Sequence, residues 1–362
     1  MTTGDFQRLR IARVRRETAE AISVTFEVPE ALRQAFAWKP GQHLAVRTTL
    51  GGEELRRTYS ICSGPDETAP RIAIKRVAGG QFSTWANDTL AAGQSLEVLP
   101  PAGRFILPEG GGAPRHLLAL AAGSGITPII AIVKHALERE PDTRVTLIYG
   151  NRTPQTILFG QELEDLKDRH LGRFVLLHAL SRGDENGAPL LEGRITGEKV
   201  KELVPKLLPL GDVAHVFLCG PGSMIKDARN ALMELGVPRE RIHHEFFAAG
   251  GGAYRTAPPP AEPAPQPGTP STEAVAILDG IRYPFPVLPG EHVLDAAIRA
   301  GIRVPFSCKG GMCCTCRARL IEGAAEMTVN YSLEPWETDR GYILTCQAVP
   351  RSERLVVDYD QM

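Results

Sequence analysis

Four cysteines near the end of the chain restrict its fold more than any other feature of the sequence. Cys308, Cys313 and Cys316 follow the spacing C-x4-C-x2-C, and Cys346 comes after 29 further residues. This spacing is typical of the four thiolates that bind a [2Fe-2S] cluster. A tight loop can supply three thiolates only if its backbone turns inward, and the glycines at 310 and 311 allow such a turn. We therefore predict that these four cysteines are iron ligands.

Zinc binding and simple burial are the alternatives for these cysteines. A four-cysteine zinc site usually combines two C-x2-4-C knuckles, whereas here the first gap is four residues and the last cysteine is isolated. Simple burial would place the cysteines separately in a core. Cys314 is not needed for a cluster, and we expect it to be a small buried residue.

The length and charge of the chain limit its other functions. With 362 residues it has room for two or three domains, so the cluster domain is only part of it. A formal net charge of -1 without any basic run gives no basis for binding nucleic acid or an anionic membrane. There is no apolar signal segment and no run of ~18 apolar residues, and the seven cysteines do not suggest a disulfide framework. We expect a cytoplasmic protein.

Residues 1–112 are predicted to form an antiparallel β-barrel. Short segments of alternating apolar and polar residues recur between turns rich in glycine and proline, a pattern typical of small barrels. The predicted strands are 22–28, 42–47, 57–62, 71–77 and 95–99. One helix is expected at 82–90, with Gly80 before it and Ser83 and Thr84 in its first turn. These residues can present amides and hydroxyls to a pyrophosphate or can serve as ordinary caps, and the sequence leaves both roles open.

Residues 113–250 are predicted to form a doubly wound α/β domain with a parallel sheet, because strands and helices alternate. The expected strands are 117–121, 144–149, 174–180, 213–219 and 242–247, and the expected helices are 128–140, 161–170, 198–207 and 224–235. The segment 123–128, GSGITP, follows the first strand, where its glycines let the backbone approach a diphosphate. It could be a mere tight turn, but 219–222, CGPG, repeats the arrangement after another strand. Together they predict a nucleotide site.

Residues 251–272 are rich in proline and cannot build a core, so they are predicted to be an extended linker of ~3.1 Å per residue. A hinge and a passive spacer are both compatible with this composition. The last domain, 273–362, would hold the cluster. Strands are expected at 275–278 and 281–287, and a helix at 292–300.

Taken together, these motifs resemble the ferredoxin-NADP reductase superfamily fused to a plant-type ferredoxin, along essentially the whole chain. The resemblance implies an α+β, β-grasp-like fold for the last domain and FAD as a cofactor. The segment 57–60, RTYS, resembles the flavin motif RxYS. It implies that Tyr59 stacks on the isoalloxazine, that Arg57 meets the pyrophosphate and that Ser60 lies near the reactive nitrogen.

The same resemblance assigns the other site residues. Those at the hydride-transfer centre would be Ser60, Cys219 and Glu245. Further flavin contacts would come from Thr58, Lys75, Val77, Gly80, Gln81, Phe82, Ser83, Thr84 and Phe247. Contacts to the nicotinamide nucleotide would come from Gly123, Ser124, Gly125, Ile126, Thr127, Gly220 and Pro221. Lys75 could equally belong to a solvated face.

The choice of nucleotide depends on one stretch. Related NADPH enzymes place a hydroxyl and a guanidinium on the 2′-phosphate where this chain has Ser181 and Arg182. No acidic residue follows the second strand at 150–152 to favour a free 2′-hydroxyl. We predict NADPH, the alternative being that Arg182 only faces solvent.

Within the superfamily, 308–317, 330–336 and 341–348 resemble the reductase subunits of phenylacetyl-CoA epoxidases. This implies transfer of electrons from NADPH through FAD and the [2Fe-2S] cluster to a separate di-iron oxygenase. The reductase of another mono- or dioxygenase, such as an alkane or aromatic-ring hydroxylase, is the alternative. A redox sensor is disfavoured because it would not need a hydride-transfer site.

Overall fold

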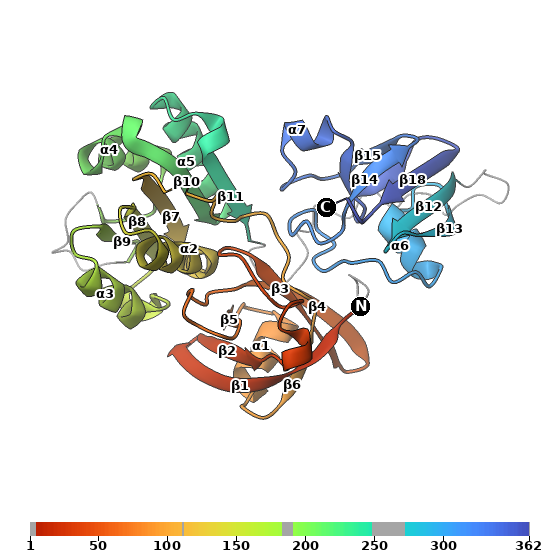
Figure 1. Cartoon of the computed structure of the whole chain (residues 1–362), viewed down its shortest axis with the longest axis horizontal. Helices are drawn as coiled ribbons and strands as arrows, with labels where there is room; N and C mark the ends of the chain where they lie inside the picture. The colour runs from red at the N-terminus through yellow and green to blue at the C-terminus, as the bar shows by residue number, and fades with distance from the viewer. Residues whose placement is uncertain (1–4, 111, 183–190, 248–271, 362) are drawn as a thin grey trace.

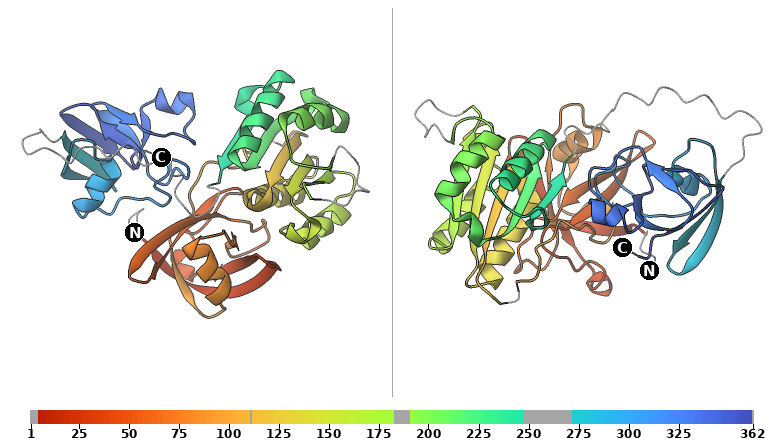
Figure 2. Two further views of the ribbon diagram at one scale, coloured as in Figure 1. Left: turned by 180° about the vertical axis from the view of Figure 1, so that it is seen from behind. Right: turned by 90° about the horizontal axis from the view of Figure 1, so that it is seen from above.

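The computed structural model describes residues 5–110, 112–182, 191–247 and 272–361. Three large sheets form the centres of three modules in chain order, which meet near the centre of the molecule (Figure 1). Seen from above, the N-terminal module lies between the other two modules (Figure 2). Within the described ranges, no helix is long and apolar enough to cross a membrane.

The N-terminal module is an antiparallel barrel. Its strands are β1 (Gln7–Thr18), β2 (Ala21–Glu27), β3 (His43–Leu50), β4 (Glu53–Ser60), β5 (Arg71–Lys75) and β6 (Ser95–Val98), in the order β4-β3-β6-β1-β2-β5. The two edges are joined by a bridge between Ile61 and Ile72 and by the Cys62 amide, which donates to the Arg71 carbonyl at 2.8 Å. The barrel predicted from the alternating pattern is therefore closed.

One helix of this module was predicted and one strand was not. The helix α1 (Gln81–Thr89) is found where it was predicted, and it buries Phe82 and Ala86 in the barrel. The strand β1 was not predicted. Only Leu9 and Ile11 of its twelve residues are fully buried, so its arginine-rich sequence carries little alternation.

The middle module is a five-stranded parallel sheet in the order β11-β10-β7-β8-β9. Its strands are β7 (His116–Ala122), β8 (Arg144–Asn151), β9 (Phe174–Leu180), β10 (Val213–Gly220) and β11 (Ile242–Phe246). The helices are α2 (Ile126–Arg139), α3 (Gly160–Arg169), α4 (Gly197–Leu207) and α5 (Gly222–Glu234). Successive residues of β7 pack alternately against α2 and α3 or against α4 and α5, so the sheet is covered on both faces, as predicted.

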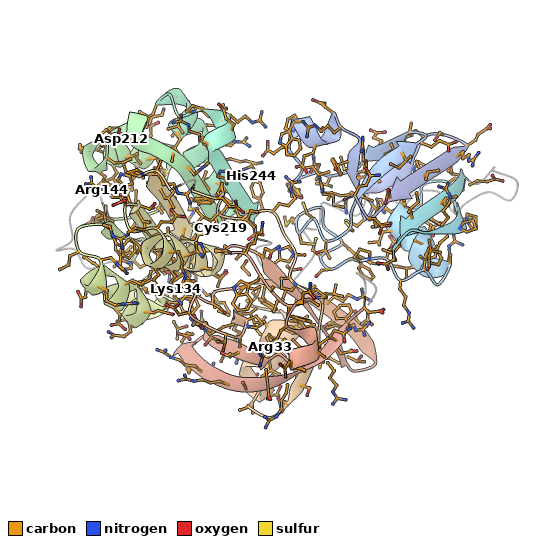
Figure 3. The ribbon with its side chains drawn as sticks, in the orientation of Figure 1. Arg33, Lys134, Arg144, Asp212, Cys219 and His244 are labelled. Carbon is orange, nitrogen blue, oxygen red and sulfur yellow. The ribbon has the colours of Figure 1, made fainter. Side chains whose placement is uncertain are left out.

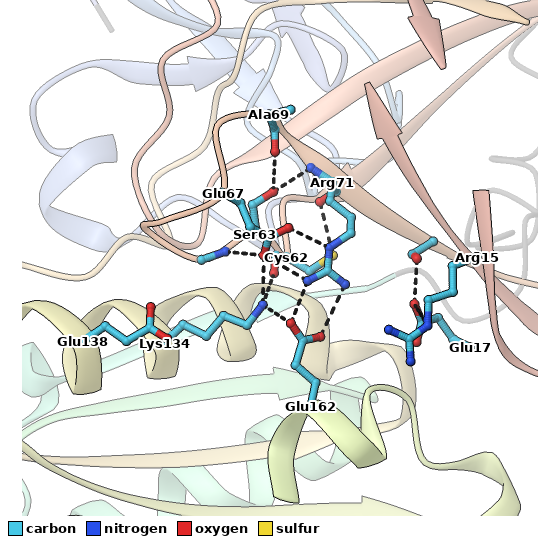
Figure 4. A network of polar contacts seen from close by, with 12 residues as sticks. Arg15, Glu17, Cys62, Ser63, Glu67, Ala69, Arg71, Lys134, Glu138 and Glu162 are labelled. Carbon is cyan, nitrogen blue, oxygen red and sulfur yellow. Dashed lines mark hydrogen bonds and ion pairs between the residues drawn. The ribbon is translucent and has the colours of Figure 1, made fainter. Parts of the chain in front are cut away.

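A network of charges, with buried cations and partly exposed carboxylates, joins the first two modules (Figure 4). The Arg71 guanidinium donates to Glu67 of its own module at 3.0 Å and to Glu162 of α3 at 2.8 Å. Lys134 of α2 lies between the same two carboxylates and also donates to the Cys62 carbonyl. Because one arginine and one lysine compensate two carboxylates, the network is electrically balanced and fixes the barrel against the nucleotide module.

The C-terminal module has a mixed sheet in the order β13-β12-β18-β14-β16 and a small pair β15-β17. Its elements are β12 (Thr272–Leu278), β13 (Ile281–Val287), α6 (Val293–Arg299), β14 (Arg317–Glu322), β15 (Ala325–Met327), α7 (Pro335–Thr338), β16 (Tyr342–Leu344), β17 (Ala348–Pro350) and β18 (Arg354–Asp358). The strands after residue 316 were not predicted. The predicted linker lies outside the described residues, except that its last position, Thr272, begins β12. The domain boundaries themselves stay predictions.

Candidate electron-transfer site

A cleft of about 1130 Å³ opens where the three modules meet. It is lined by Tyr59 and Ser60 at the end of β4, by Ser124 after β7, and by Cys308 and Cys313 of the C-terminal module. The motifs that the sequence analysis assigned to flavin, nucleotide and cluster therefore share one cavity.

Most predicted site residues line this cleft. They are Arg57, Thr58, Tyr59, Ser60, Lys75, Val77, Gly80, Phe82, Ser83, Gly123, Ser124, Thr127, Ser181, Arg182, Gly220, Pro221, Glu245, Phe247, Cys308 and Cys313. The predicted residues that do not line it are Gln81, Thr84, Gly125, Ile126, Cys219, Cys316 and Cys346. Of these, Gln81 is exposed and Thr84 is half-buried, whereas the other five are buried.

The three residues predicted at the hydride-transfer centre are close together. The Ser60 hydroxyl donates to Glu245 Oε2 at 3.3 Å, although the two residues come from different modules. Cys219 pairs with Glu245 in the parallel register of β10 and β11, at the side of the nucleotide module that faces the other two (Figure 3). Burial raises the pKa of the Cys219 thiol well above its ordinary value, and the Glu245 carboxylate adds to this effect. Both effects favour the neutral thiol of Cys219 over the thiolate.

The glycines of the GSGITP turn allow its backbone to lie close to the end of β10. A Cβ on Gly125 would lie 2.2 Å from the Cys219 carbonyl oxygen, so only glycine fits there. Gly123 has a φ of +55°, and its carbonyl accepts a hydrogen bond from the Tyr149 hydroxyl at 2.9 Å. The turn consequently holds the start of α2 at the carboxyl end of β10, where a diphosphate can reach free amides.

The serine in the first turn of α1 hydrogen-bonds to the turn that precedes the helix, and it also lines the cleft. The Ser83 hydroxyl accepts a hydrogen bond from the Val77 amide at 3.1 Å and donates to the Gly80 carbonyl at 3.3 Å. It therefore stabilises the turn before the helix. Gly80 is the N-cap and supplies no side chain, so the amides of the first turn remain for an anion.

The four predicted iron ligands form two pairs. The Cys313 thiol donates to Cys308, and the Cys316 thiol donates to Cys346. The hydrogen bond from Cys313 is the main cause that lowers the pKa of Cys308, and backbone amides, including that of Gly310 at 3.3 Å, lower it further, whereas burial acts in the opposite direction. In the described part of the chain, no three His, Cys, Asp or Glu side chains surround one point where a single ion could bind. Two thiol pairs with inward amides fit a two-iron cluster better than one zinc ion.

The chain matches three known domain families. They are the oxidoreductase FAD-binding domain over residues 9–106, the oxidoreductase NAD-binding domain over 119–230 and the 2Fe-2S iron-sulfur cluster binding domain over 276–351. The chain is also 41% identical, over 99% of both chains, to a subunit of the 1,2-phenylacetyl-CoA epoxidase of Escherichia coli K12. It belongs to the family of FAD- and NAD-binding reductases that carry a 2Fe-2S domain.

Other relatives of this reductase agree with its assignment to this family. The ferredoxin reductase component of 3-ketosteroid-9-alpha-monooxygenase from Mycobacterium tuberculosis H37Rv is 36% identical over 98% of this chain and 96% of its own. The solved structure of phthalate dioxygenase reductase is 23% identical, covers 98% of each chain and superposes with a TM-score of 0.58. That likeness supports the fold alone, and it confirms the predicted architecture of barrel, doubly wound sheet and ferredoxin domain.

One residue of the reductase site was missed by sequence reasoning. His43 at the start of β3 is 1% exposed, and its Nδ1 atom lies 3.7 Å from Glu245 Oε1. Its Nε2 atom lies 3.5 Å from the hydroxyl of Thr315, which stands between two predicted cluster ligands. Nothing local in a strand that follows Pro-Gly-Gln indicates these contacts, because both partners are more than 200 residues away along the chain.

Proposed function

We propose that the reductase takes electrons from NADPH and passes them through FAD and a [2Fe-2S] cluster to the oxygenase of a phenylacetyl-CoA epoxidase. The observation that carries the proposal is the shared cleft, in which the RTYS segment, the two nucleotide turns and the cluster loop face one another. The 41% identity to a component of such an epoxidase supports the choice of partner.

The order of the carriers follows from their chemistry. A nicotinamide gives up two electrons as a hydride, whereas a [2Fe-2S] cluster accepts one at a time, and a flavin converts between the two. The residues of the chain provide the geometry. Tyr59 and Ser60 form one wall, Glu245 holds the Ser60 hydroxyl, and the buried Cys219 thiol excludes water behind them. Cys308, Cys313, Cys316 and Cys346 would hold the cluster.

The partner is proposed to be a di-iron oxygenase made of separate subunits. Relatives named as reductase components of a steroid monooxygenase are 33–36% identical, so another oxygenase is the second candidate. The two candidates are distinguished by mixing the purified reductase with each oxygenase and measuring NADPH-dependent product formation. Turnover of phenylacetyl-CoA alone supports the first, and turnover by the steroid system alone contradicts it.

NADPH is proposed as the electron donor because arginines surround the ends of β8 and β9. Arg152, Arg182 and Arg194 line the same end of the cleft, and the Arg182 amide donates to the Arg152 carbonyl at 2.8 Å. The residue that ends β8 is Asn151, which carries no negative charge to repel a 2′-phosphate.

Replacing Arg182 with alanine is expected to raise the KM for NADPH by about tenfold, because a charged hydrogen bond to the 2′-phosphate is lost. The KM for NADH should change little. Arg144 at the opposite end of β8 is a matched control, since it is exposed and lies away from the cleft (Figure 3). If Arg182→Ala raises the KM for NADPH and the KM for NADH equally, Arg182 does not bind the 2′-phosphate.

The proposal as a whole is tested by anaerobic titration of the purified protein with NADPH and, separately, with NADH. Flavin absorbance and the EPR signal of the reduced cluster are followed together. Flavin bleaching followed by a [2Fe-2S] signal, faster with NADPH, is the expected result. A reduced flavin without any cluster signal would contradict the proposed path.

A further inference from the structure

His43 lies where all three modules meet. It belongs to the barrel, its Nδ1 atom faces Glu245 of the nucleotide module, and its Nε2 atom faces Thr315 of the cluster module. The Nδ1 atom is buried and has no hydrogen-bond partner among the described residues. A shift of about one ångström would bring it within hydrogen-bonding distance of the Glu245 carboxylate.

The ring cannot easily turn away from these two partners. The backbone of His43 exchanges hydrogen bonds with Ala102 at 2.8 and 3.0 Å, which fixes the start of β3. Gly103 packs directly on the ring, since a Cβ there would lie 2.7 Å from Nδ1. Gly103 also has a φ of +109°, a conformation that glycine tolerates and other residues avoid. The position of the imidazole is thus built into the loop beside it.

Thr315 connects the histidine to the predicted iron ligands. It is 5% exposed and lies between Cys313 and Cys316 in the sequence. A second hydroxyl contact of 2.6 Å, between Thr58 and Ser307, joins the same loop to the flavin motif. The loop therefore touches the barrel just before its first cysteine and again just before Cys316.

We propose that His43 is a positioning residue that seats the cluster loop against the flavin cleft. A neutral imidazole donates from one ring nitrogen and accepts at the other. The Glu245 carboxylate accepts only, so it selects the tautomer with the proton on Nδ1, as carboxylates do for other histidines. Nε2 is then an acceptor, and it receives the Thr315 hydroxyl when the cluster module is in place.

This role is distinct from contact with a cofactor. His43 does not line the cleft, so it acts through Glu245 and Thr315. The inference rests on the proposed function, since it gives the contact a purpose in electron transfer. Its consequence is that Glu245, which accepts the hydrogen bond from Ser60, also orders the cluster loop through His43.

Two substitutions test the contacts of the two ring nitrogens of His43 separately. In His43→Asn the amide occupies the place of Nδ1 and keeps a donor for Glu245, but nothing reaches Thr315. In Thr315→Val the hydroxyl is lost and His43 stays intact. Thr315→Ser is the matched control because it keeps the hydroxyl. Flavin content and flavin reduction by NADPH are measured first to show that each variant is folded and takes up hydride.

Two readouts are made on the full-length protein. The first is hydrogen–deuterium exchange of the peptide that covers residues 308–316, which needs no turnover. The second is the rate of cluster reduction after flavin reduction, by stopped flow. His43→Asn and Thr315→Val should each increase exchange and slow cluster reduction about fivefold, as expected for one lost hydrogen bond. The double variant should be no worse than either single variant, and Thr315→Ser should resemble the wild type.

The proposal would be overturned if Thr315→Val showed wild-type hydrogen–deuterium exchange and a wild-type rate of cluster reduction. It would also be overturned if the effects of the two single variants multiplied in the double variant. The exchange readout also separates this proposal from the proposed function. If the wild-type protein fails to pass electrons to its cluster but the loop still loosens in both variants, the contact is real and the electron path is wrong. If electrons pass normally and exchange is unchanged, the seating role fails alone.

Discussion

Replacing Cys308 with serine is expected to remove the [2Fe-2S] cluster and to stop electron delivery to any oxygenase, while NADPH continues to reduce the flavin. Only three thiolates remain in Cys308→Ser, and the pair that Cys308 forms with Cys313 is broken. The flavin motif and the nucleotide turns belong to other modules with separate cores, so they should keep their structure. The measurements are cluster EPR, flavin absorbance and stopped-flow reduction of the flavin.

Cys314→Ser is the matched control in the same loop. Cys314 is not one of the paired cysteines, and its thiol donates to the Ser332 hydroxyl at 3.0 Å. A serine can make the same hydrogen bond, so the cluster should be retained. Loss of the cluster in Cys314→Ser would mean that the ligands are wrongly assigned. Loss of flavin from Cys308→Ser would show that the modules do not fold independently.

Replacing Arg71 with methionine is expected to destabilise the junction between the barrel and the nucleotide module by about 3 kcal/mol, because it leaves two carboxylates with one lysine between them. The cost falls at the low end for a broken buried pair, since Glu67 and Glu162 are 34% and 25% exposed. This loss of stability is measured by thermal unfolding, with flavin release as the signal. Arg139→Met is the control, because its pair with Asp66 is exposed and should contribute no more than about 0.5 kcal/mol.

The same network predicts a pH dependence. Burial alone would raise the pKa of Glu67, but the hydrogen bonds and charges of Arg71, together with Lys134, lower it from 4.5 to about 2. A carboxylate whose folded-state pKa is depressed stabilises the fold above its unfolded pKa and loses that contribution as the pH falls. The stability lost in Glu67→Gln should thus be constant above about pH 4.5 and should shrink toward pH 2. A constant difference down to pH 2 would contradict the assignment.

Much of the fold could be predicted because its signals are local. The strand β9 has the bounds predicted for it, since Phe174–Leu180 is a run of apolar residues, interrupted only by His178, between polar turns. The strand β1 was missed because arginines occupy most of its exposed face and only two positions are fully buried. The short strands of the C-terminal module, such as β16 with three residues, are too brief to show any period.

The candidate site also contains residues that local motifs predict and residues that only the packing of the modules reveals. RTYS, GSGITP and the cysteine spacing are contiguous motifs, and the structure brings Ser60 and Glu245 together as the resemblance implied. His43 could not be predicted, because its significance depends on two residues that only the packing of three modules brings near it. The pairing of Arg71 with Glu162 was missed for the same reason, since 91 residues separate them.

The shared cleft has a further consequence for kinetics. The residues that line its flavin side and those of the cluster loop belong to one polypeptide, so the donor always has its acceptor at a fixed local concentration. Electron movement between them is a unimolecular process, whose rate does not depend on how much protein is present. Delivery to a separate oxygenase is bimolecular and slows as the solution is diluted. Dilution therefore separates the two steps without any change in the protein.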